Sequence, residues 1–162
     1  MSKKKSLIMS LIFAVIIFMV SFLTKKEANS TFVSLGDAFV MLAACFLPTG
    51  WAMLAALIGC GAYAFVAGGW QALLAIALFR VLAACWFMDD EDKLLTSRTV
   101  IGVVMSFVLF SCGPFLFNML ATESFGTLPT LAVSALGAIA NVVLFFILAF
   151  LGDKVKVKDR LK

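Results

Sequence analysis

The sequence contains no histidine, which excludes metal sites built on imidazole and acid–base catalysis by a histidine side chain. Its cysteines all fall within apolar runs and none forms a Cys-x-x-Cys pair, so we expect buried thiols rather than disulfides or metal ligands. These cysteines are Cys45, Cys60, Cys85 and Cys112. No P-loop motif is present for binding ATP. The sequence therefore predicts no resident metal or cofactor.

Charged residues are also scarce. They make up 14% of the 162 residues, whereas hydrophobic residues make up 64%. Typical soluble domains contain about 25% charged and about 45–50% apolar residues. A chain of this length has room for one domain, and a water-soluble domain of this size could not bury so much apolar surface. We therefore expect one integral membrane domain over residues 1–162.

The few charges are concentrated near the chain ends. Three lysines open the chain and five Lys or Arg residues lie in 153–162, whereas no charged residue occurs from Ala38 to Phe79. This pattern is a membrane-topology signal, and no basic face for nucleic acid is visible. The first apolar run, of about 17–18 residues, exceeds the usual signal-peptide core of about 7–15, so we interpret it as a retained helix.

Turn residues and charges divide the chain into six apolar segments. Helices are expected at about 6–23, 31–47, 51–67, 70–88, 99–120 and 130–151. Pro48-Thr49-Gly50 and Gly68-Gly69 provide tight turns, and Gly113-Pro114 favours a kink in the fifth helix. The predicted fold class is an all-α bundle of six transmembrane helices.

The distribution of Lys and Arg orients this bundle. If both termini and the loop 89–98 are cytoplasmic, that side holds ten of these residues and the outside holds only Lys25 and Lys26. The positive-inside rule favours this arrangement over five or seven spans, which would place one basic terminus outside. We therefore expect both termini in the cytoplasm.

Small residues form a stripe on the first helix. Ser6, Ser10 and Ala14 recur at a spacing of four, so they share one face where another helix can approach closely. On spacing alone, packing within the bundle is the favoured explanation.

Two charged residues lie in or beside the apolar layer. Arg80 lies about 15 Å along the fourth helix from Trp70, where an arginine costs about 2.5–3.5 kcal/mol and usually faces a partner or water. It could bind an acidic or hydrogen-bonding ligand, reach toward the cytoplasm, or pair with Asp37. Asp37, near the outer end of the second helix, is either an interfacial carboxylate or a ligand contact.

Further polar groups are expected near the outer mouth of the bundle or within it. Asn141 lies about mid-depth in the sixth helix, where an amide needs a partner. Trp70 either belongs to an interfacial aromatic belt or stacks on a flat heterocycle. Gln71, Asn118 and Glu123 are placed at the outer ends of their segments. Together with Asp37 and Arg80, these side chains would line a pocket for a small solute.

The segment SLGDAFVMLAACFLPTGWAMLAALIGCGAYAFVAGG (34–69), followed by LLAIALFRVLAA (73–84), resembles the substrate-binding S components of energy-coupling factor (ECF) transporters. That family shares a Leu-Gly-Asp opening of helix 2, a proline turn, a glycine-rich helix 3 and a basic residue in helix 4. The chain departs from its relatives at Ala64-Phe65-Val66, where many carry an acidic residue.

This resemblance implies a non-enzymatic, multi-pass subunit in the plasma membrane of a prokaryote. Such subunits bind a vitamin from outside, between the loop after helix 1 and helices 4, 5 and 6. They dock on a transmembrane coupling protein driven by two ATPase subunits. Docking in this family uses small residues spaced by four in helix 1, which gives Ser6, Ser10 and Ala14 a second interpretation, as a partner surface.

The substrate and two other functional classes remain open at this level. The aromatic residues suit a pyridoxine- or pyrimidine-like heterocycle, whereas Arg80 suits an anion such as pantothenate or a nicotinate-like acid. A small membrane enzyme would need paired carboxylates, for which the acidic run 89–92 is the sole candidate and a solvated loop the better explanation. A non-transporting scaffold would leave the cost of Arg80 and Asn141 unexplained.

Overall fold

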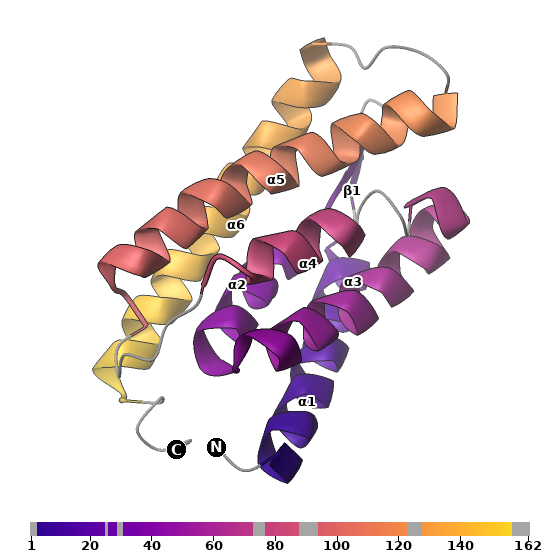
Figure 1. Cartoon of the computed structure of the whole chain (residues 1–162). Coiled ribbons are helices and arrows are strands. Elements are labelled where there is room, and N and C mark those ends of the chain that lie inside the picture. Colours follow the sequence, from indigo (N-terminus) through magenta and orange to yellow (C-terminus); the bar gives the residue numbers. More distant parts are fainter. Residues whose placement is uncertain are drawn as a thin grey trace.

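The computed structural model describes residues 3–24, 26–28, 31–72, 77–87, 94–122 and 128–156. Within them the chain forms six helices and one hairpin (Figure 1). The helices are α1 (Lys3–Leu23), α2 (Gly36–Phe46), α3 (Thr49–Ala72), α4 (Leu78–Ala84), α5 (Ser97–Thr122) and α6 (Leu128–Lys154). The antiparallel strands are β1 (Lys26–Ala28) and β2 (Thr31–Val33). The predicted six-helix fold class is confirmed.

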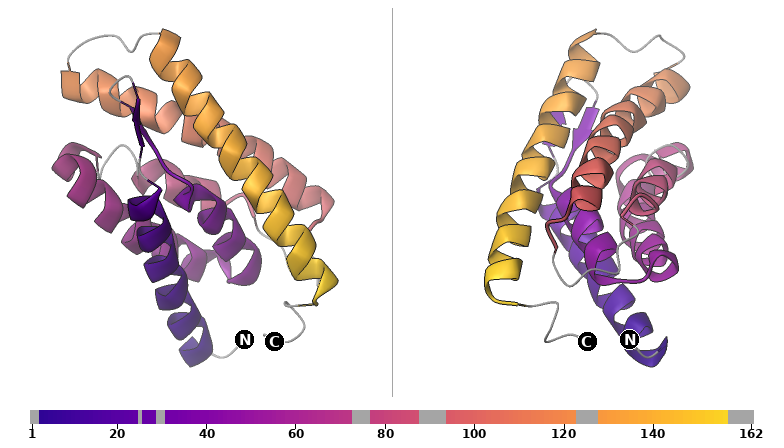
Figure 2. Two further views of the ribbon diagram at one scale, coloured as in Figure 1. Left: turned by 180° about the vertical axis from the view of Figure 1, so that it is seen from behind. Right: turned by 60° about the vertical axis from the view of Figure 1, so that its left-hand side comes forward.

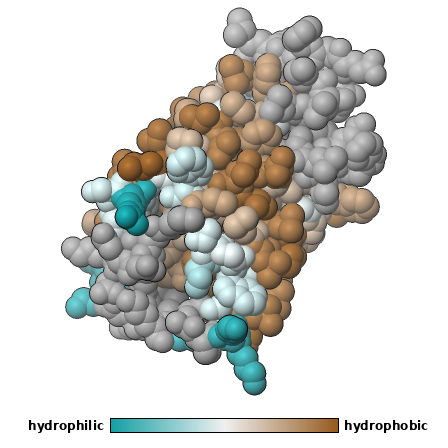
Figure 3. Space-filling model, in the orientation of Figure 1, coloured by the Kyte–Doolittle hydropathy of each residue, from teal (hydrophilic) through white to brown (hydrophobic). Residues whose placement is uncertain are grey.

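The outer surface of the bundle is apolar. Within the described residues, the segments Lys3–Leu23, Thr49–Val66 and Leu131–Lys154 are long and apolar enough to cross a membrane, and α2 and part of α5 form shorter apolar helices. On the face shown in Figure 3, hydrophobic side chains cover the middle and hydrophilic ones gather near one end. Water would not tolerate so large an exposed apolar surface, so the chain is a multi-pass membrane protein.

The two ends of the bundle differ. The start of α1 and the end of α6 lie at the same end, and the hairpin lies toward the other (Figures 1 and 2). This is the relative placement that an even number of spans requires.

Helix α2 lies at the centre of the bundle and contacts all five other helices. Nine of its 11 residues are buried, including Ala38, Ala43 and Ala44. Small side chains at these positions let neighbouring helices approach closely, and the larger Met41 fills the remaining space. The position of α2 therefore fixes how the other helices meet.

The second helix starts later than the sequence predicted. Residues 31–33, expected to be helical, form β2 instead, and α2 begins at Gly36. Thr31, Phe32 and Val33 are β-branched or aromatic and pair with β1, which favours the extended conformation. A Cβ atom at Gly36 would lie 1.8 Å from Ser21 Oγ, so α1 and α2 approach this closely because position 36 is a glycine.

The predicted turn at Gly68-Gly69 is wrong. Helix α3 continues through both glycines to Ala72, so Trp70 and Gln71 belong to the end of α3 and not to the start of the fourth helix. Glycine within a helix costs only about 1 kcal/mol relative to alanine, which is a small penalty for a helix packed on both α1 and α4. Within the described residues, α4 is correspondingly short.

The small-residue stripe of α1 lies against α3. Ser6, Ser10 and Ala14 are buried, and Ser10 Oγ donates a hydrogen bond to the Trp51 carbonyl oxygen at 2.9 Å. A Cβ atom on Gly59 would lie 2.7 Å from the Ala14 carbonyl oxygen. The stripe therefore packs within the bundle in this structure, and its interpretation as a partner surface stays a prediction.

At the end of the bundle that holds the start of α1, α6 anchors the segment that precedes α5. The Asp153 carboxylate accepts hydrogen bonds from the backbone N–H groups of Leu94 at 2.7 Å and Leu95 at 3.1 Å. Thr99 Oγ1 donates to the Leu94 carbonyl oxygen at 2.8 Å. These contacts bind the connection between α4 and α5 to the end of α6.

The close contact between α1 and α3 predicts a specific sensitivity. Gly59→Ala should lower the free energy of unfolding by about 1–3 kcal/mol, because its Cβ would press on α1 backbone. Gly50→Ala is the matched control in the same helix: no atom lies within 4 Å of its Cβ, so it should be neutral or stabilise by up to about 1 kcal/mol. Thermal unfolding in detergent compares the two variants, and equal effects would contradict this packing.

Candidate functional site

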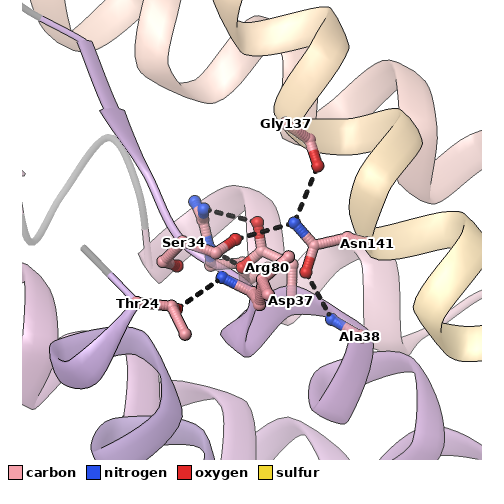
Figure 4. A network of polar contacts seen from close by, with 8 residues as sticks. Thr24, Ser34, Asp37, Ala38, Arg80, Gly137 and Asn141 are labelled. Carbon is pink, nitrogen blue, oxygen red and sulfur yellow. Dashed lines mark hydrogen bonds and ion pairs between the residues drawn. The ribbon is translucent and has the colours of Figure 1, made fainter. Parts of the chain in front are cut away.

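The charged residues of the apolar layer, Asp37 and Arg80, form an ion pair. Arg80 Nε donates to Asp37 Oδ1 at 2.5 Å, and Arg80 Nη2 donates to Oδ2 at 2.7 Å (Figure 4). The Arg80 side chain is only 5% exposed and the Asp37 side chain only 6%. Such a two-point contact matches the planar guanidinium to the carboxylate and fixes the orientation of both. Of the alternatives for Arg80, the structure thus shows the pairing with Asp37.

Two further electrostatic interactions with the surroundings stabilise the charges of the pair. The Arg80 guanidinium carbon lies 5.5 Å from the centroid of the buried Phe110 ring of α5, within cation–π range. Asp37 lies in the first turn of α2, where the helix dipole favours a negative charge. The pair thereby joins α2, α4 and α5.

Asn141 of α6 binds the start of α2. Its Oδ1 accepts a hydrogen bond from the Ala38 N–H at 2.9 Å, and its Nδ2 donates to the carbonyl oxygens of Ser34 at 2.7 Å and Gly137 at 2.9 Å. Both amide hydrogens are therefore engaged within the protein. Asn141 thereby holds the start of α2 in place, and its predicted contact with substrate stays a prediction.

Thr24 makes a second set of hydrogen bonds near the start of α2. Its Oγ1 donates to the Val20 carbonyl oxygen at 2.6 Å and accepts from the Leu35 N–H at 2.9 Å. Leu35, the N-cap residue of α2, makes no side-chain capping bond. The backbone N–H groups of Leu35 and Ala38 are thus bonded by the side chains of Thr24 and Asn141, in place of the usual local cap.

The network brings together elements that are far apart in the sequence. The hairpin 26–33 leaves α1 at Thr24 and returns to α2 at Ser34, and β2 also contacts α5 and α6. Asp37, Arg80 and Asn141 meet below this hairpin, as Figure 4 shows. Thr24, Ser34 and Phe110 belong to the site as well, although nothing in the sequence singled them out.

For the other predicted site residues, the structure describes at most the position of the backbone. Trp70 and Gln71 lie in the last turn of α3, and Asn118 lies near the end of α5. Their side chains, and the whole of Glu123, lie outside the part of the structure that is described. Among the described residues, no group of three or more cysteine or acidic side chains could hold a metal ion. Substrate contact by these four residues stays a prediction.

Comparison with known proteins identifies the architecture. The chain is similar to a solved structure of the S component of a bacterial ECF transporter, with a TM-score of 0.65 and 15% sequence identity. The match covers 91% of this chain and 94% of the other. The chain has the S-component fold. No protein-family model and no curated protein matches the sequence.

The network involves several elements of the bundle. The hairpin follows the first helix, and Arg80, Phe110 and Asn141 come from α4, α5 and α6. These are the elements between which the sequence resemblance implied a ligand, and ligand binding there stays a prediction.

The ion pair predicts strong coupling between its members. Replacing one partner, as in Arg80→Gln or Asp37→Asn, should destabilise the protein by about 3–5 kcal/mol, because a buried charge loses its counterion. The double variant Asp37→Asn/Arg80→Gln should recover most of this loss, because no charge remains to be compensated. Thermal unfolding in detergent gives the double-mutant cycle, and additive losses would contradict a direct interaction.

Asn141 predicts a local effect on α2. Asn141→Ala should cost about 1–3 kcal/mol and raise hydrogen exchange at the Ala38 amide, because it removes the acceptor for this buried N–H. Ser111→Ala is a suitable control, because Ser111 Oγ bonds only the Phe107 carbonyl oxygen of its own helix. Unchanged exchange at Ala38 in the Asn141 variant would rule out this anchoring role.

Proposed function

We propose that this protein is the substrate-binding subunit of an ECF-type importer. It captures a vitamin or related micronutrient from the outside and delivers it through a transmembrane coupling protein with two ATPase subunits. The observation that carries the proposal is the S-component fold over 91% of the chain. The location is the plasma membrane of a prokaryote, with both termini in the cytoplasm.

The polar network supports capture from the hairpin side. Buried charges and amides are costly in a membrane and commonly mark a solute pathway or binding site. Here they lie next to the hairpin, which is toward the end of the bundle opposite the start of α1. With the lysine-rich termini in the cytoplasm, this end faces the outside.

The division of labour follows from the sequence. The chain lacks a P-loop, so ATP hydrolysis is assigned to the partner subunits. Docking of the coupling protein on the stripe Ser6, Ser10 and Ala14 would require α1 to expose residues that are buried in this structure.

Ligand binding should be visible as stabilisation. The purified protein in detergent, melted against a panel of water-soluble vitamins and their precursors, should be stabilised by one of them by about 2.7 kcal/mol at a hundredfold excess over Kd. The Gly50→Ala variant should respond equally, because no atom lies within 4 Å of the added Cβ. A cooperative melt that no compound shifts would contradict solute capture.

Transport should depend on the partners. Liposomes that contain this chain with a coupling protein and both ATPases should accumulate the radiolabelled hit in the presence of ATP. Liposomes that contain the chain alone should bind the hit without accumulating it. Equal accumulation in both preparations would overturn the assignment to an ATP-driven importer.

A further inference from the structure

The apolar segments of the chain carry two charged residues in all. No Asp, Glu, Lys or Arg occurs from Ser6 to Thr24, from Ala38 to Phe79, from Val81 to Met88, from Thr99 to Thr122, or from Ser124 to Gly152. Asp37 and Arg80 are thus the sole charges from Ala28 to Met88, and they are of opposite sign. An ionic ligand held beside α2 and α4 would therefore meet this pair.

The pair is already neutral and geometrically satisfied. Both carboxylate oxygens of Asp37 accept from Arg80, at 2.5 and 2.7 Å. The guanidinium also lies within cation–π range of Phe110. Arg80 is therefore not an uncompensated cation that needs an anionic ligand to balance it.

From this geometry we infer that the substrate is an uncharged, hydrogen-bonding molecule rather than a carboxylate anion. The class is a flat heterocycle that carries hydroxyl, amino or carboxamide groups. This inference rests on the proposed function and narrows it to one of the two substrate classes that the sequence left open.

An anionic substrate would face a penalty by either route of binding. If its carboxylate displaced Asp37 from Arg80, then Asp37 would be buried without a counterion. If it bound beside the intact pair, the site would acquire a net negative charge in a medium of low dielectric constant. A neutral ligand meets neither cost.

The segments that connect the helices on the outer side add no compensating charge. Between α1 and α2 the sequence has Lys25, Lys26 and Glu27, and between α5 and α6 it has Glu123. Two cationic and two anionic residues give no net field that would concentrate anions at this end of the bundle.

Ring-matched pairs of compounds test the inference. The vitamin panel first identifies a compound that stabilises the protein. Two compounds with the same ring system are then compared, one neutral and one carrying a carboxylate. Examples are nicotinamide with nicotinate, and pyridoxine with the acid formed by oxidising one hydroxymethyl group. The neutral member should bind at least about 100-fold more tightly by isothermal titration calorimetry. The acid must either break the buried ion pair or add a net negative charge beside it.

Two variants separate charge from shape. Asp37→Asn leaves the Arg80 cation without a carboxylate, so the acid should gain at least about tenfold in affinity relative to the neutral compound. The double variant Asp37→Asn/Arg80→Gln, which has no charge at the site, should keep the preference of the native protein for the neutral member. Thermal unfolding of each variant verifies that the protein tested is folded.

The possible outcomes distinguish the inference from the proposed function. An acid that binds the native protein as tightly as its neutral partner, or more tightly, would overturn the inference and leave solute capture intact. A panel in which no ring stabilises the folded protein would count against the proposed function itself, and the inference would fall with it.

Discussion

The bidentate ion pair between Asp37 and Arg80 sets the constraint that the rest of the buried bundle satisfies. A lone charge in an apolar layer costs several kcal/mol, so the start of α2 and the part of α4 that carries Arg80 must lie side by side. Phe110 then brings α5 to the guanidinium, and Asn141 brings α6 to the backbone next to Asp37. These contacts of Asp37, Arg80 and Asn141 thus join α2, α4, α5 and α6.

The central helix depends on these contacts because it cannot stabilise its own start. With 11 residues, α2 is only about 16 Å long, too short to cross a bilayer. Its N-cap position is a leucine, so Thr24 and Asn141 satisfy the first backbone donors from outside the helix. The segment that joins the hairpin to α2 is therefore bonded to Thr24 through Leu35 and to α6 through Ser34.

Residue type and spacing were sufficient for some features of this site and insufficient for others. The pairing of Asp37 with Arg80 was one of three alternatives that the sequence left open, because two opposite charges in an apolar sequence have few other partners. Thr24 could not be found, since a threonine at the end of an apolar helix is unremarkable until Leu35 lies beside it. For Asn141, burial was predictable, but its bonds reach residues more than 100 positions away along the chain.

The stripe of Ser6, Ser10 and Ala14 illustrates the same division. Its spacing determined that one face of α1 would accept a close neighbour, and only packing decided that the neighbour is α3. Likewise, local sequence marked Gly68-Gly69 as a turn, but the contacts of α3 with α1 and α4 kept the helix continuous.

By itself, the sequence determined the membrane environment, the number of helices and the scarcity of buried charge, because these follow from composition and from the lengths of apolar runs. The tertiary structure decided which of the described polar groups meet. Hydrogen bonds and ion pairs act over a few ångströms, and the folded backbone alone sets distances between residues far apart in the chain.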